Sequence, residues 1–183
     1  TISILGDSIS TFSGVSNDAS VNATLKGGAI YYTPGTQGVY REDTWWQQTI
    51  DNLGLELLVN NAWSGSFTLI DQGQSNTTEY PAAGYKNRAV NLHKGSTKPD
   101  IICVFLGTND IAYYAEYSVG TKANIDTASE RNALYTSVNN YKTPSTVIQA
   151  YYIMISRMLA TYPDAEIYCL LPTICQNAMG TGR

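Results

Sequence analysis

The sequence predicts an α/β fold in which a parallel sheet is flanked by helices. Apolar runs such as "DIICVFL" lack the alternation of half-exposed strands, so they are typical of strands buried on both faces. These runs alternate with segments of helical periodicity, as in β-α-β units. The 183 residues show no internal repeat or linker, and a chain of this length suits a single core. We therefore expect one domain over residues 1–183.

The first part of the chain predicts a strand, a long loop and a helix. The strand covers residues 1–5. The Gly-, Ser- and Asn-rich stretch at 15–41 has no periodicity and is long enough for a functional loop. The helix covers about 43–53, where its apolar side chains form one stripe. Asp43 is placed to cap its N-terminus, and Gly54 follows its end, where a left-handed glycine is common.

The second part of the chain predicts three further strands and a long helix. Strands are expected at 55–62, 100–106 and 166–172. The stretch 111–143 is polar and Tyr-rich, and we expect it to be partly helical and a second candidate lid. Apolar residues at helical spacing fill 143–162 until a proline ends the pattern. A doubly wound sheet normally continues with another strand and helix, so we expect a domain truncated at its C-terminal strand–helix unit.

Composition and charge restrict the class of partner. The net charge of −4 and the lack of any basic run argue against nucleic acid or an anionic membrane. No apolar stretch reaches the roughly 18 residues of a membrane span. The charge-poor, Tyr-rich composition favours a secreted or extracellular protein over a cytoplasmic one, and its 14 tyrosines suit a ligand such as a sugar. No metal is predicted, since the cysteines lack metal-site spacing; Cys103 and Cys169 are expected to be buried free thiols.

Polar, glycine-containing turns follow the first three predicted strands. Gly6-Asp7-Ser8 follows the first, "NNAWSG" at 60–65 closes the second, and "GTND" at 107–110 follows the third. Ligands of open α/β sheets bind at the carboxyl ends of the strands, where these turns lie. A serine hydroxyl, a glycine N–H and an asparagine amide can thus converge. A nucleophile with several hydrogen-bond donors is what acyl transfer requires.

These three motifs, in this order, resemble the first three sequence blocks of the SGNH hydrolases, the GDSL-type esterases, lipases and acylhydrolases. The resemblance implies that Ser8 is the nucleophile, and that the Ser8 N–H, the Gly65 N–H and the Asn109 side-chain amide form an oxyanion hole. It also implies a three-layer α/β/α sandwich with a flavodoxin-like (Rossmann-like) parallel sheet, and no cofactor. The other matching positions, which would hold the loops in shape, are Gly6, Asp7, Gly107, Thr108 and Asp110.

One landmark of that family is missing. Its general base lies in an Asp-x-x-His motif near the C-terminus, and no Asp here has a His three residues later. The only histidine, His93, is expected at the opposite edge of the sheet. A serine without a base is a poor nucleophile at neutral pH. We therefore expect the base and its Asp to lie outside these 183 residues, in a C-terminal piece of the same protein, and the chain alone to be nearly inactive.

Two functions follow from these observations. The first is a serine esterase that cleaves small acyl esters, with acetyl groups on carbohydrate as the narrower expectation. The alternative is a non-catalytic glycan-binding module with a degenerate site. Nucleotide binding is disfavoured, because no G-x-G-x-x-G or P-loop follows the first strand.

The sequence leaves the roles of several other residues open. Trp63 either lines the pocket or wedges the loop, and Arg88 is expected at the surface or tying a loop. The tyrosine pairs at 31–32 and 113–114 are suited equally to sugar stacking and to loop packing.

Overall fold

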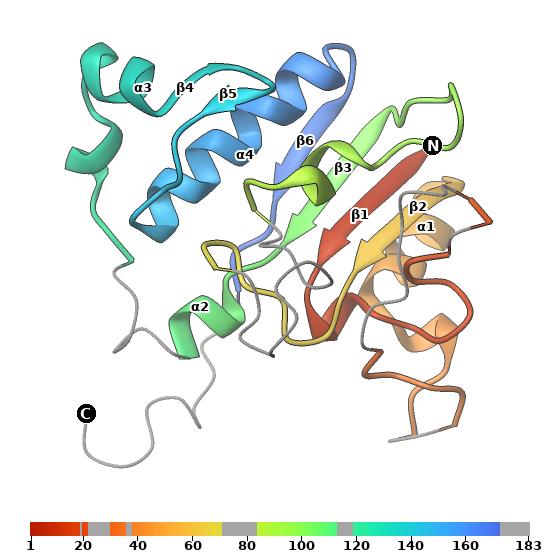
Figure 1. Ribbon diagram of the computed structural model, residues 1–183. Helices are drawn as coiled ribbons and strands as arrows, with labels where there is room; N and C mark the ends of the chain where they lie inside the picture. The colour runs from red at the N-terminus through yellow and green to blue at the C-terminus, as the bar shows by residue number, and fades with distance from the viewer. Residues whose placement is uncertain (19, 22–29, 36–37, 71–83, 113–118, 173–183) are drawn as a thin grey trace, which may run out of the picture.

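A four-stranded parallel sheet forms the centre of the protein, as predicted. The computed structural model describes residues 1–18, 20–21, 30–35, 38–70, 84–112 and 119–172. The strands are β1 (Ile2–Gly6), β2 (Leu57–Ala62), β3 (Ile101–Phe105) and β6 (Glu166–Cys169). Their order across the sheet is β2-β1-β3-β6, which puts the first strand of the chain in the interior (Figure 1). The predicted strands thus all form, with bounds one to three residues different from those expected.

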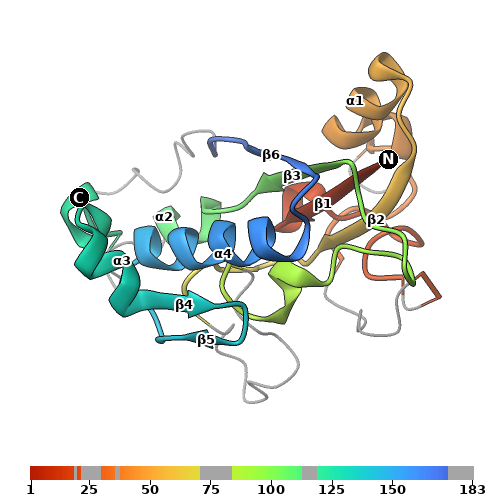
Figure 2. The same ribbon diagram turned by 90° about the horizontal axis from the view of Figure 1, so that it is seen from above.

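Helices cover both faces of the sheet, which gives the expected three layers (Figure 2). On one face, α1 (Trp45–Leu53) packs Trp46 and Ile50 against Ile2 and Ile4 of β1. On the other face lies α4 (Val147–Thr161), whose Met154 and Met158 share a core cluster with strand and loop residues. The strand members of that cluster are Leu5, Ile102 and Val104. No helix in the described part of the chain has the length and apolar character needed to cross a bilayer.

Both long helices begin later in the chain than predicted, because each of them starts after a threonine N-cap. Thr44, not Asp43, is the N-cap of α1, and its hydroxyl oxygen accepts the Gln47 N–H at 3.3 Å. Asp43 instead ends a preceding 3-10 turn. Gly54 adopts the predicted left-handed conformation after α1, with φ of 62°. Helix α4 starts after its own N-cap, Thr146, later than predicted.

The segment predicted to be a partly helical lid contains a β-hairpin that sequence patterning did not reveal. Its helices are α2 (Thr108–Ala112), a 3-10 turn η5 (Lys122–Ile125) and α3 (Ala128–Leu134). The hairpin strands are β4 (Tyr135–Ser137) and β5 (Asn140–Tyr141). Strands this short show no detectable alternation. The remaining 3-10 turns are η1 (Ser8–Ser10), η3 (Arg41–Asp43) and η4 (Asn87–Val90).

The two described cysteines have different environments. Cys103 on interior strand β3 is buried, as expected, whereas Cys169 is exposed, so the expectation of a second buried thiol was wrong. The reason is that β6 is an edge strand, and its side chains are covered less than those of the strands inside the sheet.

Candidate active site

The ends of β1, β2 and β3 lie side by side, and this brings the three motifs to one edge of the sheet. In the parallel register Gly6 is opposite Ala62 of β2 and Phe105 of β3. The chain therefore leaves all three strands at the same level. The Trp63 N–H also donates to the Gly6 carbonyl at 3.1 Å, which holds the second turn against the first.

Ser8 begins the short turn η1, directly after β1. Asp7 is the N-cap of this turn, and its Oδ1 accepts the Ile9 N–H at 3.1 Å. A side chain at Gly6 would place its Cβ 2.4 Å from Ser10 Oγ, so only glycine fits the start of the turn. Ser8 itself is partly exposed while Asp7 is buried. The turn thus leaves the serine accessible and buries the carboxylate beneath it.

Gly65 lies in a tight turn directly after β2. The Ser66 N–H donates to the Trp63 carbonyl at 3.2 Å, and Gly65 has a φ of 75°, so this is a turn of type II with glycine in its third position. The Gly65 N–H takes no part in the hydrogen bond that closes such a turn. Within the described residues no group accepts it. It is therefore a free donor at the edge where Ser8 lies.

Asn109 is fixed by the same turn. Its Nδ2 donates to the Ser66 carbonyl at 2.8 Å, and since an amide nitrogen carries two hydrogens, one remains for a ligand. The next residue, Asp110, accepts the N–H groups of Thr68 and Leu69 at 2.8 and 3.1 Å. Helix α2 and the loop after β2 are thus joined by three hydrogen bonds, and the amide of Asn109 cannot turn freely.

Two buried carboxylates and a buried guanidinium lie under these turns. Burial raises the pKa of Asp7 to about 6; the charge of Asp110 adds to the rise, and the Ile9 N–H, the Thr108 hydroxyl and Arg88 oppose it. Burial also raises the pKa of Asp110, against the two N–H groups that it accepts. The pKa of Arg88 falls to about 9 because of its burial, with Asp7 acting against the fall. Within the described residues, no three His, Cys, Asp or Glu side chains gather in a metal-binding group.

Arg88 is the main residue of this region that the sequence did not identify. Its guanidinium donates to Ser66 Oγ at 2.7 Å, to the Asn61 carbonyl at 2.6 Å and to the Gly6 carbonyl at 3.3 Å. It is only 4% exposed, so the expectation of a loop-tying residue is confirmed and that of a surface position is wrong. Two of its three partners are backbone carbonyls, which leave no pattern in the sequence, so no motif could have revealed it.

Trp63 is also buried, at 4% exposed. The Arg88 guanidinium lies over its ring, 4.7 Å from the ring centre. Of the two roles left open by the sequence, this position favours the wedge that supports the turn rather than a wall of the pocket.

His93 lies at the other edge of the sheet, as expected. Its Nδ1 is 3.2 Å from the hydroxyl of Tyr162, the residue that follows α4. Tyr162 lies shortly before the start of β6 at Glu166. The Glu166 N–H donates to the carbonyl of Asp100, the residue that directly precedes β3. His93 is therefore near the amino ends of the strands, whereas Ser8 is at their carboxyl ends.

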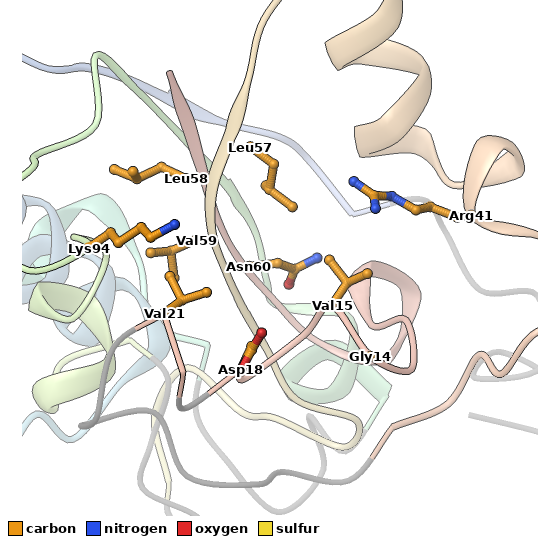
Figure 3. A pocket seen from close by; sticks show the side chains of 10 residues that line it. All are labelled: Gly14, Val15, Asp18, Val21, Arg41, Leu57, Leu58, Val59, Asn60 and Lys94. Atoms are coloured by element: carbon orange, nitrogen blue, oxygen red, sulfur yellow. The ribbon is translucent and has the colours of Figure 1, made fainter.

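A half-open cavity of about 190 Å³ lies elsewhere, along the outer edge of β2 (Figure 3). Apolar side chains such as Leu57 and Val15 line it together with Asp18, Arg41 and Lys94. Of the motif residues, Asn60 is part of its lining, whereas Ser8, Gly65 and Asn109 are not. No serine, threonine or cysteine is part of its described lining, so its position does not suggest acyl transfer through a hydroxyl or thiol.

Comparison with known proteins gives one family. A family model described as GDSL-like lipase/acylhydrolase matches residues 1–181. A Bacteroides ovatus protein that carries the name of a GDSL-like lipase has a similar crystal structure, with a TM-score of 0.66 and 26% identity over 97% of this chain and 74% of that one. A similarly named protein from Bacteroides uniformis has the same fold, with a TM-score of 0.60 and 24% identity over the same shares, 97% and 74%. No curated protein matches the chain significantly.

Proposed function

The chain belongs to the GDSL-like lipase and acylhydrolase family, and from this premise we propose that it is a serine esterase in which Ser8 attacks small acyl esters. The observation that carries the proposal is the shared edge: Ser8, the free N–H of Gly65 and the fixed amide of Asn109 all leave strand ends that are in register. Donors placed in advance where negative charge develops are the largest single contribution to most acyl-transfer reactions.

In the proposed reaction the Ser8 hydroxyl oxygen forms a bond to the carbonyl carbon and loses its proton to a base. The carbonyl oxygen becomes an oxyanion and accepts hydrogen bonds from the N–H groups of Ser8 and Gly65 and from Asn109 Nδ2. As the intermediate collapses, the bond to the alcohol breaks and the base returns the proton to the leaving oxygen. In the second half, the base accepts a proton from a water molecule whose oxygen bonds to the acyl carbon. The bond from that carbon to Ser8 then breaks, the base returns the proton to the Ser8 oxygen, and the carboxylic acid leaves.

The base in this proposal is a histidine outside these 183 residues. The only histidine of the sequence, His93, contacts Tyr162 near the amino ends of the strands and is on the wrong side of the sheet to serve Ser8. A further segment of the same protein would therefore supply the histidine and its orienting carboxylate. The chain by itself would keep only the residual rate that the oxyanion hole provides.

The carbohydrate part of the proposal rests on Tyr31. Its N–H donates to Thr11 Oγ1 at 2.9 Å, and the same hydroxyl donates to the Ser8 carbonyl at 2.8 Å. Tyr31 is 48% exposed, and its ring packs edge-to-face on Tyr32, with ring centres 4.9 Å apart. Thr11, which holds Tyr31, directly follows the η1 turn that begins with Ser8. An exposed aromatic ring at this place is suited to packing against a sugar ring on the alcohol side of the ester.

Chemical rescue of the missing base tests the esterase proposal. The chain is incubated with a fluorophosphonate, with and without imidazole, and the mass added at Ser8 is followed over time. We expect slow labelling that imidazole accelerates, none in Ser8→Ala, and a rate reduced about a hundredfold in Asn109→Ala. Labelling that is absent with imidazole, or equal in Ser8→Ala, contradicts the proposal. Binding of sugars that survives Ser8→Ala in an unlabelled chain would instead identify a glycan-binding module.

Protection experiments test the carbohydrate proposal separately. An acetylated oligosaccharide should slow the imidazole-assisted phosphonylation of Ser8 by occupying the site. We expect Tyr31→Ala to weaken this protection several-fold. Tyr40→Ala is the matched control, because Tyr40 is exposed to a similar degree, 53%, and lies outside the η1 contacts. Equal protection in both variants would remove the role of Tyr31 and leave the esterase proposal intact.

A further inference from the structure

We propose that Arg88, acting through Ser66, is a positioning residue that sets the direction of both non-nucleophile donors of the oxyanion hole, Gly65 N–H and Asn109 Nδ2. This inference rests on the proposed esterase function.

The guanidinium of Arg88 forms hydrogen bonds with three segments of the chain. It donates to the last residue of β1 through the Gly6 carbonyl and to β2 through the Asn61 carbonyl. Its third bond goes to the Ser66 hydroxyl, on the turn that holds Gly65. One planar group with donors in a fixed fork therefore relates the nucleophile strand to the oxyanion turn.

Ser66 connects Arg88 to the two oxyanion-hole donors. Its hydroxyl accepts from Arg88 and donates to the Trp63 carbonyl at 2.7 Å, which reinforces the turn with Gly65 at its third position. Its carbonyl accepts the Asn109 amide at 2.8 Å. A displacement of Ser66 therefore moves the Gly65 N–H and the Asn109 amide together.

Stability alone does not account for an arginine at this place. A buried cation loses its hydration, and replacement of buried ionic groups by apolar ones is often neutral or stabilising. Here the burial is nearly complete, and the Nε of Arg88 has no acceptor among the described residues. The guanidinium provides three hydrogen bonds of fixed direction to three segments of the chain. The negative charge of Asp7 acts in favour of the charged guanidinium.

The second buried arginine, Arg157, provides a matched control. It is 1% exposed, donates to the carbonyls of Val138 and Tyr85, and lies over the Tyr141 ring at 4.5 Å. Its burial and ring contact thus resemble those of Arg88. Its hydrogen bonds join α4 to the β4–β5 hairpin and to Tyr85 and Asn87, on the segment that leads into Arg88, and none of them goes to Ser66. Replacing it by lysine likewise removes a buried guanidinium, but it leaves the bonds of Ser66 to Arg88, Trp63 and Asn109 in place.

The experiment compares Arg88→Lys, Ser66→Ala and Arg157→Lys in the 183-residue chain. Lysine keeps the charge but cannot make the forked bonds, and Ser66→Ala removes the link while leaving Arg88 its two carbonyl partners. The first readout is the pair of Asn109 side-chain amide resonances in ¹⁵N–¹H spectra, which requires no catalysis. The second is the rate of imidazole-assisted phosphonylation of Ser8, measured over a range of probe concentrations.

We expect Arg88→Lys and Ser66→Ala to shift the Asn109 resonances and to slow the maximal rate of phosphonylation about ten- to a hundredfold, as for a misplaced oxyanion donor. The probe concentration at half-maximal rate should change less than about twofold, because binding before reaction does not use the oxyanion hole. Arg157→Lys should leave both readouts near those of the parent. If Arg88→Lys does not fold, Ser66→Ala still provides both readouts.

Two results would overturn the inference. One is an effect of Arg157→Lys on Asn109 and on the rate that equals that of Arg88→Lys. The other is a Ser66→Ala variant with unchanged resonances and rate. A parent chain that is never labelled refutes the esterase proposal instead, and the Asn109 resonances then still decide whether Arg88 and Ser66 position that amide.

Discussion

Replacement of Asp7 by asparagine is expected to stabilise the protein at neutral and alkaline pH and to lose this benefit in acid. The Asp7 carboxyl group is 1% exposed, and the folded state raises its pKa from the ordinary 3.8 to about 6. Above pH 6 the folded protein must therefore hold a buried negative charge that the unfolded chain keeps in water. Asparagine removes this charge, and its side-chain oxygen can still accept the Ile9 N–H.

The size of the effect follows from the difference between the two pKa values. A rise from 3.8 to about 6, at about 1.4 kcal/mol for each pKa unit, corresponds to about 3 kcal/mol of destabilisation above pH 6. The sign is that of a carboxyl group with a raised pKa: the folded state binds more protons, so stability falls as pH rises from about 4 to about 6. Loss of the countercharge for Arg88 reduces the net gain in the variant.

Urea unfolding of the parent and of Asp7→Asn between pH 4 and pH 8 measures this effect. We expect the difference in free energy of unfolding to grow in favour of the variant by up to about 3 kcal/mol across that range and to level off above pH 7. Asp51→Asn, at an exposed position of α1, is the control for the exchange itself. A difference between parent and Asp7→Asn that does not change with pH would refute the reasoning.

Three further predictions concern single contacts. Gly65→Ala forces a side chain into a φ of 75° and should cost about 1 kcal/mol in urea unfolding as well as slow the labelling of Ser8; unchanged stability would contradict the strained turn. Thr146→Ala removes the acceptor for the Gln149 N–H and should lower the free energy of unfolding by about 1 kcal/mol, whereas Thr146→Ser should not. A maleimide should modify Cys169 before Cys103 in the folded chain, as peptide mapping would show; the reverse order would contradict their exposures.

The continuous apolar runs of the sequence and the turns that follow them were enough to predict the sheet and the edge at which the Ser8, Gly65 and Asn109 turns lie. Continuous apolar runs identified β1 and β3, and the turn residues that follow them, Ser8 and Asn109, were found because ligands of such sheets bind at the carboxyl ends. The exact start of α1 was not predictable in the same way. Asp43 and Thr44 are both good capping residues, and only the three-dimensional path of the preceding 3-10 turn selects Thr44.

Contacts between a side chain and a distant backbone group could not be predicted at all. Arg88 is bonded to carbonyls 27 and 82 residues away, and any residue type provides a carbonyl. Ser66 was overlooked for a similar reason, because serine next to a turn glycine is common in loops. The motifs therefore identified the groups proposed to touch substrate, while the groups that orient them became visible only in the folded chain.

The interior position of β1 has a consequence for how the chain is made. This strand is synthesised before the other three strands of the sheet, yet one of its two neighbours, β3, begins at Ile101. At about 5–20 residues per second, a ribosome needs roughly 5–20 s to make the intervening chain. During that time one edge of an apolar strand has no partner, a situation that favours aggregation or chaperone binding. The strand that leads into the Ser8 turn thus depends on the chain being extended to β3 without delay.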